Sequence, residues 1–229
     1  MPNALLPDWE QVLAAATHLQ RILPDAVLVG GTASALYARH RLSTDADHVI
    51  TDLRQHFDRV LAQLESVAGW QTARITRPVQ ILGSLDGIET GVRQLIRKAP
   101  LEVTRIEISG ETITLPTPAE ILRIKGALIL KRNATRDYLD FVALADYIGD
   151  CDFVAALQAF DELYPQPNGE SALQQLQIQL AQPLPFDLDE VNLAEYKSLD
   201  PRWHEWQWVC AVAIHCAALI FDRITGLEE

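Results

Sequence analysis

The stretch VGGTASALYARHRLSTDAD, residues 29–47, carries the clearest structural pattern in the chain. Leading into it, the apolar run AVLVG at residues 26–30 ends in glycine and predicts a short buried strand. Residues 32–39 predict a short helix, and residues 46–51 predict a second strand. The order of strand, glycine turn, helix and strand indicates a core that mixes helices with a sheet.

The same stretch carries two features that suit phosphate chemistry. Gly30 and Gly31 let a phosphate approach the backbone, and the helix that follows points its N-terminus at such an anion. Asp45 and Asp47 are two residues apart on the predicted strand, so their side chains face the same way. Two neighbouring carboxylates resist burial unless a cation joins them. A Mg²⁺ ion that bridges nucleotide phosphates would satisfy this requirement.

The rest of the sequence divides into a β-rich part and a helical part. Asp8 can cap a helix over 9–22, and residues 54–67 predict another helix. Residues 70–115 are rich in strand-forming segments and turn signals. From Pro116 onward, helices are predicted over 118–132, 135–149, 152–163, 171–182 and 203–224. We therefore expect an α+β protein, with a mixed-sheet domain at 1–115 and a helical domain at 116–229 that completes an active-site cleft.

Two charged residues lie on otherwise apolar helix stripes in the second part. Lys125 shares its face with Ile121 and Leu128. It either snorkels to solvent or points into a cleft, where it would neutralise a transferring phosphate. Asp137 lies on the apolar stripe of the next helix. It is either an acid that favours a helix N-terminus or a buried carboxylate that needs a partner.

These residues resemble a known superfamily. Gly30-Gly31-Thr32 with Asp45-x-Asp47 looks like the signature of the nucleotidyltransferases. More narrowly, three further motifs are similar to the AbiEii/AbiGii toxins, the toxin halves of type IV toxin–antitoxin and phage-defence systems. These motifs are Arg41-x-Ser43-x-Asp45-x-Asp47, Lys125-x-x-Leu128 with Arg132, and Arg136-Asp137-x-x-Asp140.

The resemblance implies a nucleotidyltransferase-like mixed sheet and a two-metal transfer of a nucleoside monophosphate from an NTP. It implies that Asp45 and Asp47 hold Mg²⁺, that Lys125 contacts phosphate, and that Asp137 is a base or a third acidic group. The residues implied to hold the nucleotide are Gly30, Gly31, Thr32, Arg41, Ser43 and Arg132. Many superfamily members carry a third metal-binding carboxylate on a later strand, for which Glu102 and Glu107 are the candidates.

Three functions remain open at this point. The first is a toxin that transfers a nucleotide to RNA, above all tRNA, or to a protein, with an antitoxin encoded nearby. The second is a small-molecule nucleotidyltransferase of the aminoglycoside-modifying kind, against which the Arg136-Asp137-x-x-Asp140 helix argues. The third is a non-catalytic interaction module, which the intact Asp45 and Asp47 disfavour.

Charge is distributed unevenly. The net charge is −12, and residues 150–229 hold 3 basic and 14 acidic residues. Residues 93–136 hold nine basic and four acidic residues, so we expect a polyanionic acceptor to approach there rather than over the C-terminal helices. The expected contacts are Arg97, Lys98, Arg105, Arg123 and Arg132.

Composition excludes several classes of protein. With 48% hydrophobic and 22% charged residues, the chain is an ordinary globular protein and not a disordered one. We see no apolar run near the ~20 residues of a spanning helix and no basic start of a signal peptide. We expect His48 to be a packed or surface histidine rather than a ligand. We expect Cys210, His215 and Cys216 to lie in a helix core rather than to bind zinc. We therefore expect a cytoplasmic protein with reduced thiols and no membrane contact.

Overall fold

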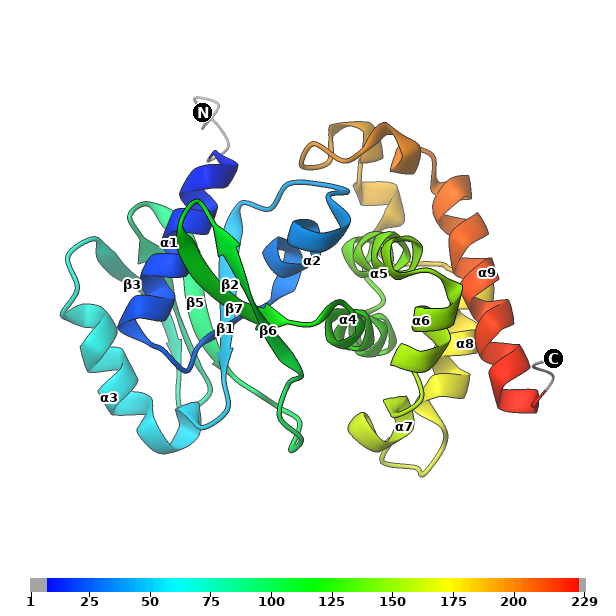
Figure 1. Cartoon of the computed structure of the whole chain (residues 1–229), viewed down its shortest axis with the longest axis horizontal. Helices are drawn as coiled ribbons and strands as arrows, with labels where there is room; N and C mark the ends of the chain where they lie inside the picture. Colours follow the sequence, from blue (N-terminus) through cyan, green and yellow to red (C-terminus); the bar gives the residue numbers. More distant parts are fainter. Residues whose placement is uncertain (1–7, 227–229) are drawn as a thin grey trace. The chain divides into compact units, whose positions relative to one another are not determined.

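The computed structural model describes residues 8–226, and its contacts divide the chain into two units (Figure 1). The first unit runs up to Ala33 and continues over Leu42–Thr117. The second holds Ser34–Arg41 together with the chain from Pro118 onward. The expectation about a signal peptide rests mostly on residues 1–7, which lie outside the described residues.

The first unit is built on a five-stranded sheet with the strand order β1-β2-β5-β4-β3. Strands β2 and β5 pair in parallel and the other neighbours are antiparallel, so the sheet is mixed as expected. A separate antiparallel hairpin joins β6 and β7. The strands are β1 (Val27–Leu28), β2 (Asp45–Ile50), β3 (Trp70–Thr76), β4 (Gln80–Leu85), β5 (Ile88–Gln94), β6 (Val103–Ile108) and β7 (Glu111–Pro116).

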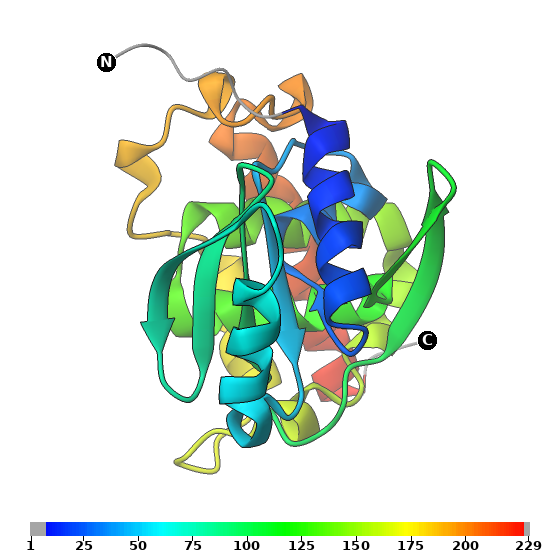
Figure 2. The ribbon, with the colours of Figure 1, turned by 90° about the vertical axis from the view of Figure 1, so that its left-hand side faces the viewer.

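Helices α1 (Trp9–Ile22) and α3 (Leu53–Glu65) lie side by side on one face of this sheet (Figure 2). Asp8 caps α1 as predicted, because its side chain accepts a hydrogen bond from the backbone N–H of Glu10. Residues at helical spacing on both helices bury their apolar faces against the strands. The shared core includes Leu19, Phe57, Leu61, Leu64, Ile81 and Val92.

Strand β2 separates this core from the outward face of the sheet. Its residues alternate between buried and half-buried along the strand. Ala46, His48 and Ile50 are buried. Asp45 and Asp47 face the other way, as the spacing of two residues predicts.

His48 is fully buried, so of the two expected positions, packed or on the surface, the structure has the packed one. One ring nitrogen, Nδ1, lies 2.9 Å from the backbone oxygen of Ala46. Burial lowers the pKa of His48 from 6.5 to about 4, against hydrogen bonds to the backbone that raise it.

This pKa predicts how stability depends on pH. Below pH 6.5 the unfolded chain protonates His48, whereas the folded chain does so only near pH 4. Stability is therefore full above pH 6.5, falls as the pH drops towards 4, and loses about 3 kcal/mol through this residue. Urea unfolding at pH 7, 6, 5 and 4 measures this loss. His48→Leu removes the titrating group, so a difference between variant and parent that stays constant with pH would contradict the assignment.

The second unit consists of helices. Helix α2 (Gly30–Ala38) begins in the first unit, and its residues from Ser34 onward belong to the second. Helix α4 packs against α5 and α8, and α9 packs against α5, α6 and α8. The bounds are α4 (Pro118–Arg132), α5 (Thr135–Ile148), α6 (Asp150–Ala156), α7 (Phe160–Leu163), α8 (Ala172–Ala181) and α9 (Trp206–Thr225). The α+β class with a helical C-terminal part is confirmed.

Two predicted helices differ from the observed ones. The helix expected over 152–163 is divided into α6 and α7, because the chain turns at Leu157. The helix expected over 203–224 starts later, because Pro201–Trp203 forms a separate 3₁₀ helix that Asp200 caps. Two further 3₁₀ helices, Leu188–Glu190 and Leu193–Glu195, lie in the segment where no element was expected.

Helix α9 corrects the expectation that no segment is long enough to span a membrane. Its 20 residues are long and apolar enough to do so by length and composition, with 28% of its most apolar window buried in the structure. His215 lies within this helix and does not interrupt it. His215 is also not a core residue: it is exposed, with Nε2 3.0 Å from Asp150, whereas Cys216 is buried.

Candidate functional site

The turn between β1 and α2 brings the glycine backbone against Asp47. The N–H of Val29 donates to the backbone oxygen of Asp47 at 2.8 Å, which fixes the turn beside β2. Gly30 has φ +75°, a conformation that side chains rarely adopt. A Cβ on Gly30 would lie 3.6 Å from Cβ of Asp47 and 3.7 Å from its Oδ2. Glycine therefore allows the turn to pack against this carboxylate, and the approach of a phosphate to its backbone stays a prediction.

Asp45 is held by two hydroxyl side chains from the same segment. Ser43 Oγ donates to Oδ1 of Asp45 at 2.7 Å, and the hydroxyl of Thr32 donates to the backbone oxygen of Asp45. Both Thr32 and Ser43 are buried. Their observed contacts orient Asp45, and the predicted role of these residues in holding a triphosphate stays a prediction.

Arg93 lies on the same face of the sheet as the two aspartates. It belongs to β5, where Val49 is its register partner, and its Nη2 lies 3.5 Å from Oδ1 of Asp47. Both side chains are partly exposed, so this contact is a weak and solvent-screened one. Asp47 therefore remains accessible to a cation that competes with Arg93.

Glu89 is a third carboxylate on this face, and sequence reasoning missed it. Register pairs it directly with Asp45 across the parallel strands β2 and β5. Parallel register partners project from the same side of a sheet, and Glu89 is exposed. The two residues considered from the sequence lie elsewhere: Glu107 is on the β6–β7 hairpin and Glu102 immediately precedes it. We call Asp45, Asp47 and Glu89 the carboxylate face.

The donors of the carboxylate face fit a Mg²⁺ ion that is shared with a substrate. Mg²⁺ prefers oxygen ligands and is commonly held by one or two carboxylates, waters and substrate phosphates rather than by a full protein cage. Asp45 and Asp47 supply two such carboxylates on one side of β2. Among residues 8–226 there is no group of three or more acidic, His or Cys side chains arranged to hold a metal by themselves.

The second unit contains a buried cluster of charges centred on Asp140, which has no exposed surface. Arg41 donates to both carboxylate oxygens, with Nε 2.8 Å from Oδ1 and Nη2 3.1 Å from Oδ2. Lys125 Nζ lies 2.6 Å from Oδ2, and His40 Nε2 lies 2.7 Å from Oδ1. Asp140 therefore joins a segment at the end of α2 to helices α4 and α5.

Asp137 forms the second half of this cluster. Arg132 Nε lies 2.5 Å from Oδ2 of Asp137 and its Nη2 lies 2.8 Å from Oδ1, a bidentate pair. Lys125 Nζ is 3.6 Å from Oδ1 of Asp137, so the lysine lies between the two aspartates. Asp137 lies in the first turn of α5, and its carboxyl has no exposed surface, so both expectations hold: it is an acid at a helix start and a partnered buried carboxylate.

The cluster holds more positive than negative charge. Three permanent or strongly basic cations, Arg41, Lys125 and Arg132, surround the two carboxylates Asp137 and Asp140. Burial alone would raise the pKa of the Asp140 carboxyl, but Arg41, Lys125 and His40 together hold that pKa well below its ordinary value. Arg132 is 37% exposed at its side chain, so the excess charge reaches solvent there.

The predicted site residues thus fall into two groups. Gly30, Gly31, Thr32, Ser43, Asp45 and Asp47 lie in the first unit, and Arg41, Lys125, Arg132 and Asp137 lie in the second. Each group is assembled within its own unit. That the two groups face one substrate stays a prediction.

One expected acceptor contact is wrong. Arg123 is 4% exposed, with Nη2 2.7 Å from Glu120 and Nη1 2.9 Å from the backbone oxygen of Ala156. A buried and paired guanidinium cannot meet a macromolecule. The positive balance of residues 93–136 is therefore partly internal, because Lys125 is buried as well.

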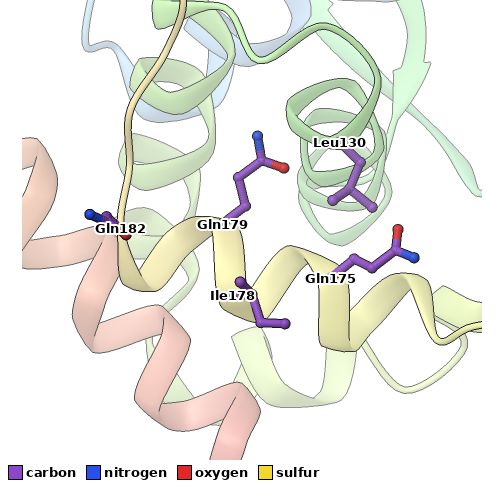
Figure 3. Close-up of a pocket in the computed structure, with 5 residues that line it drawn as sticks. All are labelled: Leu130, Gln175, Ile178, Gln179 and Gln182. Atoms are coloured by element: carbon purple, nitrogen blue, oxygen red, sulfur yellow. The ribbon is translucent and has the colours of Figure 1, made fainter.

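A pocket of about 430 Å³ lies apart from these residues, between α4 and α8 (Figure 3). Its walls are Leu130, Gln175, Ile178, Gln179 and Gln182. Two of the glutamines are engaged, since Gln175 donates to Glu170 at 2.9 Å and Gln179 donates to Asn133 at 2.7 Å. None of the predicted site residues lines it.

In sequence, the chain is similar to part of the MmpL11 proteins of mycobacteria. No family profile matches the chain. Over 220 residues the chain is 37% identical to the heme uptake protein MmpL11 of Mycobacterium tuberculosis, a match that covers 89% of this chain. The chain spans 22% of the length of that relative.

Solved structures resemble the chain over most of its length. JHP933 from Helicobacter pylori matches with a TM-score of 0.58 and 17% identity over 95% of this chain and 92% of that protein. A candidate nucleotidyltransferase from H. pylori matches with a TM-score of 0.53 and 17% identity, covering 96% of both chains. An antigenic nucleotidyltransferase-like protein from Paracoccidioides brasiliensis matches with a TM-score of 0.53 and 17% identity, over 87% of this chain and 98% of that one. These likenesses, together with the mixed sheet and its strand order, show that the chain has the nucleotidyltransferase fold.

Proposed function

We propose that the protein is a Mg²⁺-dependent nucleotidyltransferase of the AbiEii/AbiGii toxin type. The observation that carries this proposal is the placement of Asp45 and Asp47 on the outward side of β2, directly beside the Gly30 turn, within a nucleotidyltransferase fold. The φ of +75° at Gly30 favours glycine there and places the backbone of the turn against the Asp47 side chain.

Each part of the site has a role in binding an NTP. The first turn of α2 presents the backbone N–H groups of its N-terminal residues, which suit a phosphate. Asp45 and Asp47 would hold Mg²⁺, with Ser43 orienting Asp45 and Glu89 as a third carboxylate. Bound Mg²⁺ would neutralise the negative charge of the triphosphate.

The charged cluster around Asp137 and Asp140 supplies positive charge that complements the negative phosphates of an NTP. Arg132, whose side chain is 37% exposed, is fixed by Asp137 and would bind phosphate oxygens in a defined geometry, whereas Lys125 is buried between Asp137 and Asp140 and holds these two carboxylates in place. Asp137 is then a positioning residue for Arg132. This interpretation replaces the earlier one, in which Asp137 acted as a base, because both oxygens of Asp137 are taken up by Arg132.

The acceptor is an RNA, above all tRNA, or a protein, and the reaction would take place in the cytoplasm. The toxin role predicts an antitoxin encoded nearby. An aminoglycoside-like acceptor is the competing assignment, and a non-catalytic module is the third.

One experiment separates these functions. The protein is incubated with each of the four α-³²P-labelled NTPs, Mg²⁺, and one acceptor pool: total RNA, cell proteins or a panel of aminoglycosides. We expect label in RNA or protein, and none with EDTA. Label in aminoglycosides alone would support the small-molecule enzyme. Calorimetry of NTP binding with and without Mg²⁺ runs alongside, and absence of any Mg²⁺-dependent binding would leave only the non-catalytic module.

A further inference from the structure

Helix α9 presents an apolar face that the rest of the described chain does not cover. Its inner side, with Val209, Ala213, Cys216 and Ile220, is buried on the neighbouring helices α5, α6 and α8. On the outer side, Ile214 and Phe221 are 50% and 49% exposed, and Trp208 is 55% exposed. Exposed large apolar side chains gathered on one helix face indicate an interaction surface.

The outer face has the spacing of a helix–helix seam. Ala211, Ile214, Ala218 and Phe221 are separated by steps of three and four residues, the a/d pattern of a heptad repeat. Ala211 and Ala218, like Ile214 and Phe221, are on the exposed side. The same pattern extended by one step in each direction reaches Gln207 and Thr225, so no charged residue lies on the seam. We call these six positions the α9 seam.

The α9 seam is complementary to itself when reversed. If two copies of α9 cross antiparallel with a two-fold axis at the level of Cys216, each residue faces the one at an equal distance on the other side of Cys216. Each alanine of the seam then meets a large apolar side chain, and the polar ends meet each other. The facing pairs are Ala211 with Phe221, Ile214 with Ala218, and Gln207 with Thr225.

We propose that the α9 seam binds the α9 seam of a second copy of this chain, giving a two-fold symmetric dimer. An isologous interface requires that residue i contacts j and that j contacts i, so each of these three pairs occurs twice across the two-fold axis. Alanine at every second position lets two helices approach to the short end of the usual 8–10 Å range. A large residue from the partner then fills each gap, as knobs fill holes.

Charge argues against a membrane as the occupant. Asp222 is on α9 beside the seam, and Asp150 lies against His215 on the same flank. An anionic lipid surface would be repelled by these acids, whereas helices that bind such surfaces carry Lys and Arg there. Lipid also needs no matching of small to large positions.

The same acids predict an unusual salt dependence for a dimer. The chain carries a net charge of −12, so two copies repel each other outside the seam. Salt shortens the Debye length from ~30 Å at 0.01 M to ~3 Å at 1 M, which screens this repulsion and leaves the apolar contact in place. Dimerisation should therefore become tighter with added salt.

Sedimentation equilibrium of the whole chain at 20, 150 and 500 mM NaCl measures the association. We expect a concentration-dependent dimer whose dissociation constant falls at least threefold from 20 to 500 mM. Ile214→Glu should weaken it at least thirtyfold. Ile178→Glu is the matched control, since Ile178 is an exposed isoleucine of α8 outside the seam, and it should leave the constant unchanged. Circular dichroism of both variants confirms that they fold.

Disulfide trapping tests the register. In a background with Cys151→Ser and Cys210→Ser, one preparation carries Ala211→Cys and another carries Phe221→Cys. Antiparallel pairing brings these two positions together across the seam, while it separates each from its own copy by about 15 Å along the axis, too far for a disulfide. The mixture should cross-link and neither preparation alone should do so.

Four results would overturn the proposal. They are a monomer at every salt concentration, a dimer that Ile214→Glu does not weaken, and cross-linking of either single preparation by itself, which means parallel pairing. The fourth is a monomer that floats with phosphatidylcholine vesicles, whereas its Ile214→Glu variant does not. This result would mean that the α9 seam binds lipid. None of these measurements depends on nucleotidyl transfer.

Discussion

Replacing Asp47 with Asn is expected to lower nucleotidyl transfer about a thousandfold, which corresponds to ~4 kcal/mol of lost transition-state stabilisation. The amide keeps the shape of the side chain but removes the charge that would hold Mg²⁺ beside Gly30. The fold should remain intact, because the only ion pair of the Asp47 side chain among the described residues is a solvent-screened contact with Arg93. The measurement is the initial rate with α-labelled NTP, together with urea unfolding of both proteins.

Asp25→Asn is the matched control for this prediction. Asp25 is an exposed aspartate in the loop between α1 and β1, so its substitution should change neither rate nor stability. Full activity of Asp47→Asn would contradict the metal assignment. Glu89→Gln tests whether this third carboxylate takes part in metal binding. A loss of more than tenfold in the transfer rate would support metal binding by Glu89 together with Asp45, and an unchanged rate would limit the metal ligands to the two aspartates of β2.

Replacing Asp140 with Asn is expected to give the largest loss of stability in the chain, about 3–5 kcal/mol. The carboxylate lies against Arg41, Lys125 and His40, and removal of its charge leaves buried cations without compensation. Urea unfolding at pH 7 measures the change in the free energy of unfolding.

Asp146→Asn is the control for Asp140→Asn. Asp146 also accepts from an arginine, with Arg202 Nη2 2.7 Å from its Oδ1, but both side chains are about half exposed. An exposed pair of this kind contributes at most ~1 kcal/mol. If the two variants lose equal free energy of unfolding, the buried contacts of Asp140 stabilise the fold no more than the exposed ion pair of Asp146 does.

The sequence predicts those parts of the structure that depend on local pattern. The outward placement of Asp45 and Asp47 follows from a period of two on a strand whose other residues are buried. The apolar stripe around Lys125 marks this residue as unusual but leaves open whether it reaches solvent or a cleft, and the structure instead buries it between Asp137 and Asp140. The ends of α1, α4 and α5 are predicted to within one residue, because capping residues and proline mark them.

Long-range pairing accounts for what the sequence does not predict. Glu89 reaches the carboxylate face only because β5 pairs with β2, and nothing in residues 88–94 specifies that neighbour. His40 and Arg41 are partners of Asp140 across about a hundred residues of chain. Strand β3 was not identified as a separate element because it lies at the sheet edge and six of its seven residues are exposed, which removes the alternation that marks a half-buried strand.

The order of synthesis separates the segment Ser34–Arg41 from the rest of the helical unit to which it belongs. By its contacts this segment belongs with the helical unit, yet it is synthesised before most of the sheet, and the chain passes between the two units three times. At ~5–20 residues per second, the hundred residues from His40 to Asp140 take about 5–20 s to emerge. During that interval His40 and Arg41 are outside the ribosome without the carboxylate that later contacts both of them. A nascent chain stopped before residue 140 therefore lacks the centre of its charged cluster, and the helical unit needs both Ser34–Arg41 and the segment from Pro118 onward.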